Sequence, residues 1–89
     1  MKWTDEQIKG KILHKLTRIG KFEHSHTAIE NLQKGFPGEL RGRVKDAVND
    51  LVKEQIFHIK PTGYGKQISI NTERKEKIMY YIDAFLRME

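Results

Sequence analysis

The sequence predicts a mainly α-helical fold with a small β-hairpin, arranged as three helices, a two-stranded hairpin and a C-terminal helix. Apolar residues recur with the spacing of one helical face over residues 8–19, 40–52 and 78–86. Around Gly63 and Gly65 the spacing changes to the alternation that is typical of half-buried strands. With 89 residues, the chain has the length of one domain with a single core.

The first helix is marked at both ends. Thr4 and Gln7 have the spacing of a capping box, in which each side chain bonds the other's backbone N–H. Trp3 and Ile8 occupy the two positions of a hydrophobic staple around that cap. Gly20 follows the last apolar residue of the stripe, so the helix is expected to end there.

Two further helices are predicted before the hairpin. Thr27 and Glu30 repeat the capping-box spacing, so a short second helix is expected to start at Thr27 and end at Gly35. Pro37 suits the first position of a third helix, because its missing N–H would have no partner there. The third helix is predicted over residues 37–55.

The strands of the hairpin are predicted over residues 56–60 and 67–71, and they enclose a glycine-containing turn. A fourth, amphipathic helix is expected to start at Asn71 or Thr72. This places residues 1–71 in the main unit and residues 72–89 in a C-terminal helix. Two roles are open for that helix: it dimerises with its counterpart in a second chain, or it packs onto the first helix.

The segment from Val44 to Phe57 resembles the pattern V-(R/K)-x-A-(L/V)-x-x-L-x-x-x-G-(L/I)-(I/V) of transcription regulators such as the GntR type. The residues that match it are Val44, Lys45, Ala47, Val48, Leu51, Ile56 and Phe57. Gln55 stands where the pattern has Gly, and the spacing from Leu32 to Val44 is longer than in the GntR type. Because of these two departures, the resemblance is to the winged helix-turn-helix superfamily rather than to that family. It covers about residues 4–71.

The resemblance implies that helix 37–55 enters the major groove of DNA and that residues 60–67 form the wing. The net charge of +5 and the pI near 9.6 favour a polyanionic partner. The N-terminal half of the helix is its basic half, and recognition helices enter the groove by that end. Arg41 and Arg43 are the candidate base-reading residues, because arginine bridges O6 and N7 of guanine. Gly42 would allow close backbone approach, and Lys45 could reach base or phosphate.

The remaining candidate contacts lie in the wing, on the first helix and near the end of the second. In the wing they are Lys60, Tyr64 and Lys66. Candidate phosphate contacts elsewhere are Lys11, Lys15, Arg18 and Lys34. The alternative for each group is an ordinary solvated helix face or a plain hairpin turn.

Several other classes of function are disfavoured. The chain has no Cys, its histidines lack a recognised metal-ligand spacing, and no catalytic motif is present, so neither an enzyme nor a metal or cofactor is expected. No apolar run approaches the length of about 20 residues that a membrane helix needs. A cytoplasmic location is expected.

These observations predict a DNA-binding protein, a transcription regulator, whose partners are double-stranded DNA and a second copy of the chain bound through residues 72–89. The alternative is a winged-helix module that binds proteins of the transcription or replication machinery.

Overall fold

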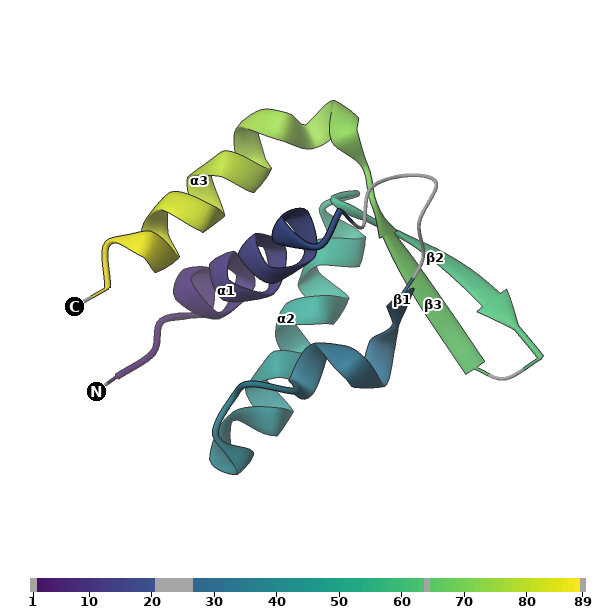
Figure 1. Cartoon of the computed structure of the whole chain (residues 1–89), viewed down its shortest axis with the longest axis horizontal. Coiled ribbons are helices and arrows are strands. Elements are labelled where there is room, and N and C mark those ends of the chain that lie inside the picture. Colours follow the sequence, from purple (N-terminus) through teal and green to yellow (C-terminus); the bar gives the residue numbers. More distant parts are fainter. Residues whose placement is uncertain (1, 21–26, 64, 89) are drawn as a thin grey trace.

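The computed structural model describes residues 2–20, 27–63 and 65–88, and the molecule measures 38 × 28 × 23 Å along its principal axes. Over these residues the chain forms three α-helices, a three-stranded antiparallel sheet and short 3-10 helices (Figure 1). The α-helices are α1 (Asp5–Arg18), α2 (Arg41–Lys53) and α3 (Lys75–Leu86), and the strands are β1 (Thr27–Ala28), β2 (Phe57–Thr62) and β3 (Gly65–Ile70). The prediction of a mainly helical chain with a small antiparallel sheet is confirmed.

α1 has the ends that the sequence predicts. The capping box is formed: the Thr4 N–H donates to Gln7 Oε1 at 2.9 Å, and the Gln7 N–H donates to Thr4 Oγ1 at 3.1 Å. The helix ends at Arg18, and Gly20 then adopts the left-handed conformation (φ 74°) that glycine tolerates without strain. Ile8, Ile12, Leu13 and Leu16 form its buried face.

The second capping box is wrong. Thr27 and Ala28 form the strand β1, in which Thr27 pairs with Ile68 of β3. The helix that follows is a 3-10 helix, Ile29–Gln33, and it begins without a side-chain cap. Strand pairing uses the backbone groups of Thr27 and suits its β-branched side chain, so it prevails over the local cap pattern. The sheet therefore has three strands, and the predicted two-stranded hairpin forms two of them.

The third helix starts later than predicted. Pro37 has extended backbone (ψ 145°), a 3-10 turn follows over Gly38–Leu40, and α2 then runs from Arg41 to Lys53. Val44, Ala47, Val48 and Leu51 form its buried stripe, as the apolar spacing predicts. Beyond its end, Gln55 has φ 62°, the left-handed conformation that favours glycine. This is the position at which the regulator pattern has Gly.

The sheet has the strand order β1–β3–β2, with β2 at one edge. The hairpin is in the predicted place, with Phe57 opposite Ile70. Its strands extend further toward the turn than the predicted ranges 56–60 and 67–71, because strand pairing continues as far as Thr62 opposite Gly65. Pro61 lies in β2, where an edge strand tolerates its missing N–H. The side chains of Phe57, Ile68 and Ile70 are buried, and they attach the base of the hairpin to the helices.

α3 packs on α1, which lies between α3 and α2 in Figure 1. Asn71 caps a 3-10 turn over Thr72–Arg74, and α3 follows it. Ile78, Tyr81 and Ile82 of α3 belong to the same buried cluster as the apolar residues of α1 and α2. Of the two roles left open for the C-terminal helix, packing onto the first helix is thus observed within the single chain.

Glu54, at the end of α2, joins all three α-helices. Its carboxylate accepts hydrogen bonds from Lys9 of α1 (3.1 Å), from Lys77 of α3 (3.1 Å) and from the Tyr81 hydroxyl. Partial burial acts to raise the pKa of Glu54, but the three hydrogen bonds and the charge of Lys9 outweigh it, so the pKa lies below its usual value. Partial burial, together with the bond to Glu54, raises the pKa of Tyr81 to about 12.

Replacing Glu54 with glutamine should lower the free energy of unfolding by about 1–3 kcal/mol at about pH 7, because charge-assisted bonds to Lys9 and Lys77 are lost. Because the pKa of Glu54 is lower in the folded than in the unfolded protein, its ionised carboxylate stabilises the fold at pH values above the unfolded-state pKa. This contribution is lost as the pH falls through the folded-state pKa and the carboxylate becomes protonated. The difference between the two proteins should therefore shrink near pH 3. Urea unfolding at both pH values measures it, with the exposed Glu30→Gln as control. A difference that is independent of pH would contradict the role of the carboxylate charge.

Candidate nucleic-acid interface

A groove separates the exposed side of α2 from the inner face of β3. This α2–β3 groove has a volume of about 210 Å³, and its lining residues are Ile29, Gln33, Val44, Lys45, Val48, Asn49 and Lys66. Lys45 and Lys66 are both exposed and come from different elements, α2 and β3. The fold thus brings together one candidate from the helix and one from the wing.

The two flanks of α2 differ in what their charged side chains do. The flank facing α1 is committed to internal ion pairs: Lys9 Nζ lies 3.1 Å from Glu54 Oε2 and 3.7 Å from Asp50 Oδ2. Arg43 is on this side too, and its guanidinium donates to Asp5 Oδ1 at 3.0 Å. Two acidic residues at the C-terminal end of α2, Asp50 and Glu54, are therefore neutralised by ion pairs within the fold.

The opposite flank carries the side chains that face solvent. Arg41, Lys45 and Asn49 follow one another at i, i+4 and i+8, so they share one face of α2, and all three are exposed. Gly42 is exposed as well, and apart from its own helix and chain neighbours no described atom lies within 4 Å of the place where a Cβ would be. The backbone at the start of α2 is therefore open to close approach.

The wing candidates are divided between the two faces of the hairpin. Lys60 pairs with Gln67 and Lys66 pairs with Pro61, and neighbouring pairs along a strand point to opposite faces. Lys66 shares the face of Ile68 and lines the groove, whereas Lys60 lies on the other face. Tyr64 lies outside the described residues.

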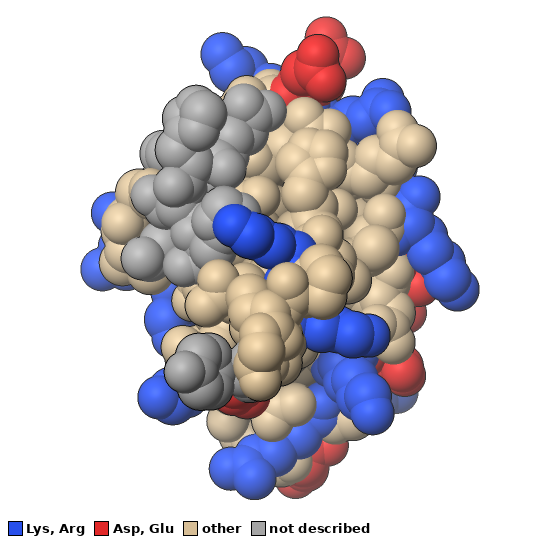
Figure 2. Space-filling model, turned by 90° about the vertical axis from the view of Figure 1, so that its right-hand side faces the viewer, with Lys and Arg blue, Asp and Glu red and all other residues tan. Residues whose placement is uncertain are grey.

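The hairpin end of the molecule presents many cations. In Figure 2, Lys and Arg side chains lie across the centre and lower half of this face and along both sides. Asp and Glu side chains appear on it at the top and along the right and lower edges. The charge on this side is compatible with a polyanionic partner.

The four other candidate phosphate contacts lie away from the α2–β3 groove. Three are on α1, and Lys34 directly follows the 3-10 helix Ile29–Gln33. They line a hollow of about 370 Å³, called the α1 hollow, with lining residues Lys11, His14, Lys15, Arg18, Ile19, Lys34, Gly35 and Phe85. It shares no lining residue with the α2–β3 groove. The predicted contacts therefore form two separate basic surfaces.

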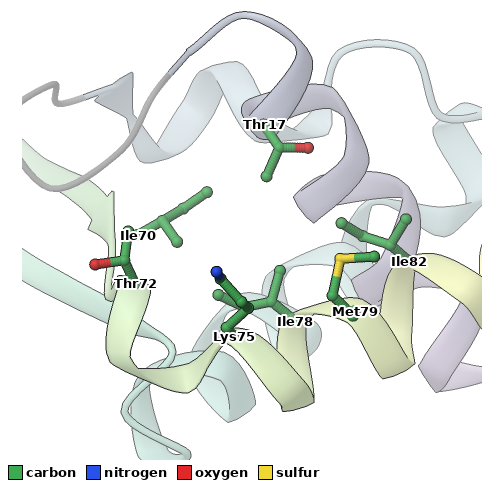
Figure 3. Close-up of a pocket in the computed structure, with 7 residues that line it drawn as sticks. All are labelled: Thr17, Ile70, Thr72, Lys75, Ile78, Met79 and Ile82. Atoms are coloured by element: carbon green, nitrogen blue, oxygen red, sulfur yellow. The ribbon is translucent and has the colours of Figure 1, made fainter.

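A third hollow, of about 240 Å³, lies between the end of α1, the end of β3 and α3. Figure 3 shows Thr17 of α1 facing Lys75, Ile78 and Met79 of α3 across this space. Its walls are mostly apolar, and its volume is below the range of about 300–1,000 Å³ that is common for small-molecule sites. We assign it no ligand.

Sequence reasoning missed the two uncharged polar residues that line the groove, Gln33 and Asn49. Amides hydrogen-bond adenine edges and phosphates, so they suit this position. The signal for Asn49 was present, since it stands four residues after Lys45 on the same helix. Gln33 had no such signal, because its place depends on how the 3-10 helix packs against α2.

Among the described residues, no group of three or more His, Asp or Glu side chains is placed to hold a metal ion. None of the helices in the described part of the chain has the length and apolar character needed to cross a membrane. No protein-family model, no curated protein and no solved structure matches this chain.

Proposed function

We propose that this chain is a double-stranded DNA-binding protein of the winged helix-turn-helix class and acts as a transcription regulator. In this proposal α2 lies in the major groove, and the hairpin contacts the backbone or the minor groove. The observation that carries the proposal is the α2–β3 groove, which is lined by the exposed Lys45 of the helix and the exposed Lys66 of the hairpin.

The order of elements supports the class. A helix is followed by a short strand, a short helical segment, a second α-helix and a hairpin, and the sheet order is β1–β3–β2. This arrangement leaves one flank of α2 uncovered next to the hairpin. A major groove about 12 Å wide admits an α-helix, so an uncovered flank with cations at its N-terminal end is suited to enter it.

The ion pairs of α2 refine the assignment of roles. Arg41 is exposed and has no ion-pair partner among the described residues, so its guanidinium suits contact with a guanine. Lys45 and Lys66 suit phosphates on either side of a groove. Arg43 reads a base in this proposal only after it leaves Asp5. Arg41 is therefore the stronger of the two base-reading candidates.

Homodimerisation through residues 72–89 stays a prediction. α3 uses Ile78, Tyr81 and Ile82 for packing within the chain, and Met79, Tyr80 and Leu86 remain exposed. In a symmetric dimer formed through these exposed residues, two copies of α2 would meet half-sites about 34 Å apart on one face of DNA.

The experiment that tests the function is selection of duplexes from a random pool on the purified protein, at about 50 mM and about 200 mM salt. We expect an enriched sequence at both concentrations, and a palindrome if the protein acts as a symmetric dimer. Binding without enrichment that is lost at the higher salt would contradict sequence-specific regulation. No binding at either concentration would contradict DNA binding itself.

A further inference from the structure

The α1 hollow gathers like charges, none of which is paired with a carboxylate of a described residue. Lys11, Lys15 and Arg18 come from one face of α1, and Lys34 comes from the segment after the 3-10 helix. No carboxylate is among the lining residues that the structure describes. Elsewhere in the described chain, cations such as Lys9, Lys77 and Arg87 are paired with carboxylates.

Contacts between the two segments hold the hollow in place. The Lys11 ammonium donates to the Gly35 carbonyl at 2.6 Å and lies 4.8 Å from the centre of the Phe36 ring. The Lys15 ammonium is 3.4 Å from the Lys34 carbonyl oxygen. Carbonyl dipoles and aromatic rings orient these cations without cancelling their charge, so the hollow keeps a positive potential.

The hollow also has an apolar wall. Phe85 of α3 lies at one side, with its ring centre 5.6 Å from that of His14, and Ile19 is 55% exposed. The Phe85 ring packs on Trp3 and His14 and stays partly exposed at the hollow. A phosphate backbone would use the cations but would leave Ile19 and the exposed part of Phe85 uncovered. A peptide segment with acidic residues and one large apolar side chain would use both.

We propose that the α1 hollow is a docking site for an acidic protein segment that carries a large apolar side chain between its carboxylates. The carboxylates meet Lys15, Arg18 and Lys34, and the apolar side chain covers Phe85 and Ile19. Since the α2–β3 groove shares none of these residues, the protein could hold this segment and DNA at the same time. The proposal does not depend on the DNA-binding function.

The test uses a fluorescein-labelled synthetic peptide in which glutamates flank one phenylalanine, and a labelled duplex, both followed by fluorescence anisotropy. The variant Lys15→Glu with Arg18→Glu should lower peptide affinity by at least about tenfold, because two attractions become repulsions. Because an acidic residue at the end of α1 opposes the helix dipole, the pair Lys15→Gln with Arg18→Gln serves as a second variant. It should lower the affinity by about fivefold.

The matched control is Lys45→Glu with Lys66→Glu, which has the same net charge as the first variant. It should leave peptide affinity unchanged within about twofold, allowing for general electrostatic attraction. A peptide with alanine in place of phenylalanine should bind more weakly than the parent. Equal loss in both variant pairs, or equal binding of the two peptides, would overturn the proposal. So would a loss of duplex binding in the α1 variant as large as in the groove variant, since the hollow would then be a nucleic-acid surface.

Discussion

Replacing Gly10 with alanine should destabilise the protein strongly, because the added methyl group has no room where α1 packs on α3. At the crossing of α1 and α3, a Cβ on Gly10 would lie 1.9 Å from the Tyr81 carbonyl oxygen and 2.7 Å from Phe85 Cβ. The nearest atom belongs to the main chain and cannot rotate away, so α3 has to move off α1. Overpacking typically costs about 1–3 kcal/mol, and because the close contact is with a main-chain atom we expect about 3 kcal/mol, which exceeds the gain of about 1 kcal/mol in helix propensity.

We expect a net loss of about 2 kcal/mol, which corresponds to a fall in Tm of roughly 10 °C for a domain of this size. Thermal unfolding followed by circular dichroism measures it. Gly42→Ala is the matched control, because Gly42 is also helical and its added Cβ would meet no described atom within 4 Å outside its own helix and chain neighbours. That variant should gain about 0.5–1 kcal/mol. If Gly10→Ala were as stable as the parent, α3 would not lie against α1 as described.

Reversing the charge at both walls of the α2–β3 groove should abolish most of the DNA affinity. In the variant Lys45→Glu with Lys66→Glu, two phosphate contacts become repulsive, and we expect a loss of about 3 kcal/mol, or about 100-fold. The slope of log affinity against log salt should flatten by about two units, since each phosphate contact contributes roughly 0.9. Both quantities come from anisotropy titrations of a labelled duplex over a salt series.

The matched control carries the same change of charge on exposed residues outside the groove, Lys2→Glu with Lys75→Glu. This control should lose only the general attraction of net charge, a few-fold at about 100 mM salt, where screening is strong beyond about 10 Å. A loss as large as that of the groove variant would mean that net charge alone, and not the groove, governs binding.

The ends of α1, the buried stripe of α2 and the hairpin followed from the sequence because local signals determine them. The Thr4–Gln7 box and Gly20 act within one turn of the helix. β1 could not be predicted in this way, since Thr27 and Ala28 match a capping pattern locally and become a strand only by pairing with β3. The packing of α3 on α1 could not be predicted either, because an apolar stripe does not indicate which surface it will contact. Gly10, placed in the middle of an amphipathic helix, was the available signal of a close approach.

The candidate interface was predicted in part for the same reason. The basic N-terminal half of the helix predicted Arg41, Arg43 and Lys45 as contacts. That Arg43 is paired with Asp5 could not be predicted, because the pair joins residues far apart in the chain. The order of residues in the hairpin did not reveal that Lys60 and Lys66 lie on opposite faces, because this depends on the register of the strands. Charge counted along the sequence also treats Asp50 and Glu54 as free, although the fold uses both for Lys9.

The most direct test of the proposed interface is an NMR titration of the ¹⁵N-labelled protein with the duplex obtained by selection. We expect the largest amide shift changes in residues 41–49 of α2 and at Lys66, with small changes at the exposed residues Met79 and Tyr80 of α3. Shift changes confined to α3 or to the α1 hollow, with α2 unaffected, would contradict the assignment of the α2–β3 groove as the DNA-binding surface.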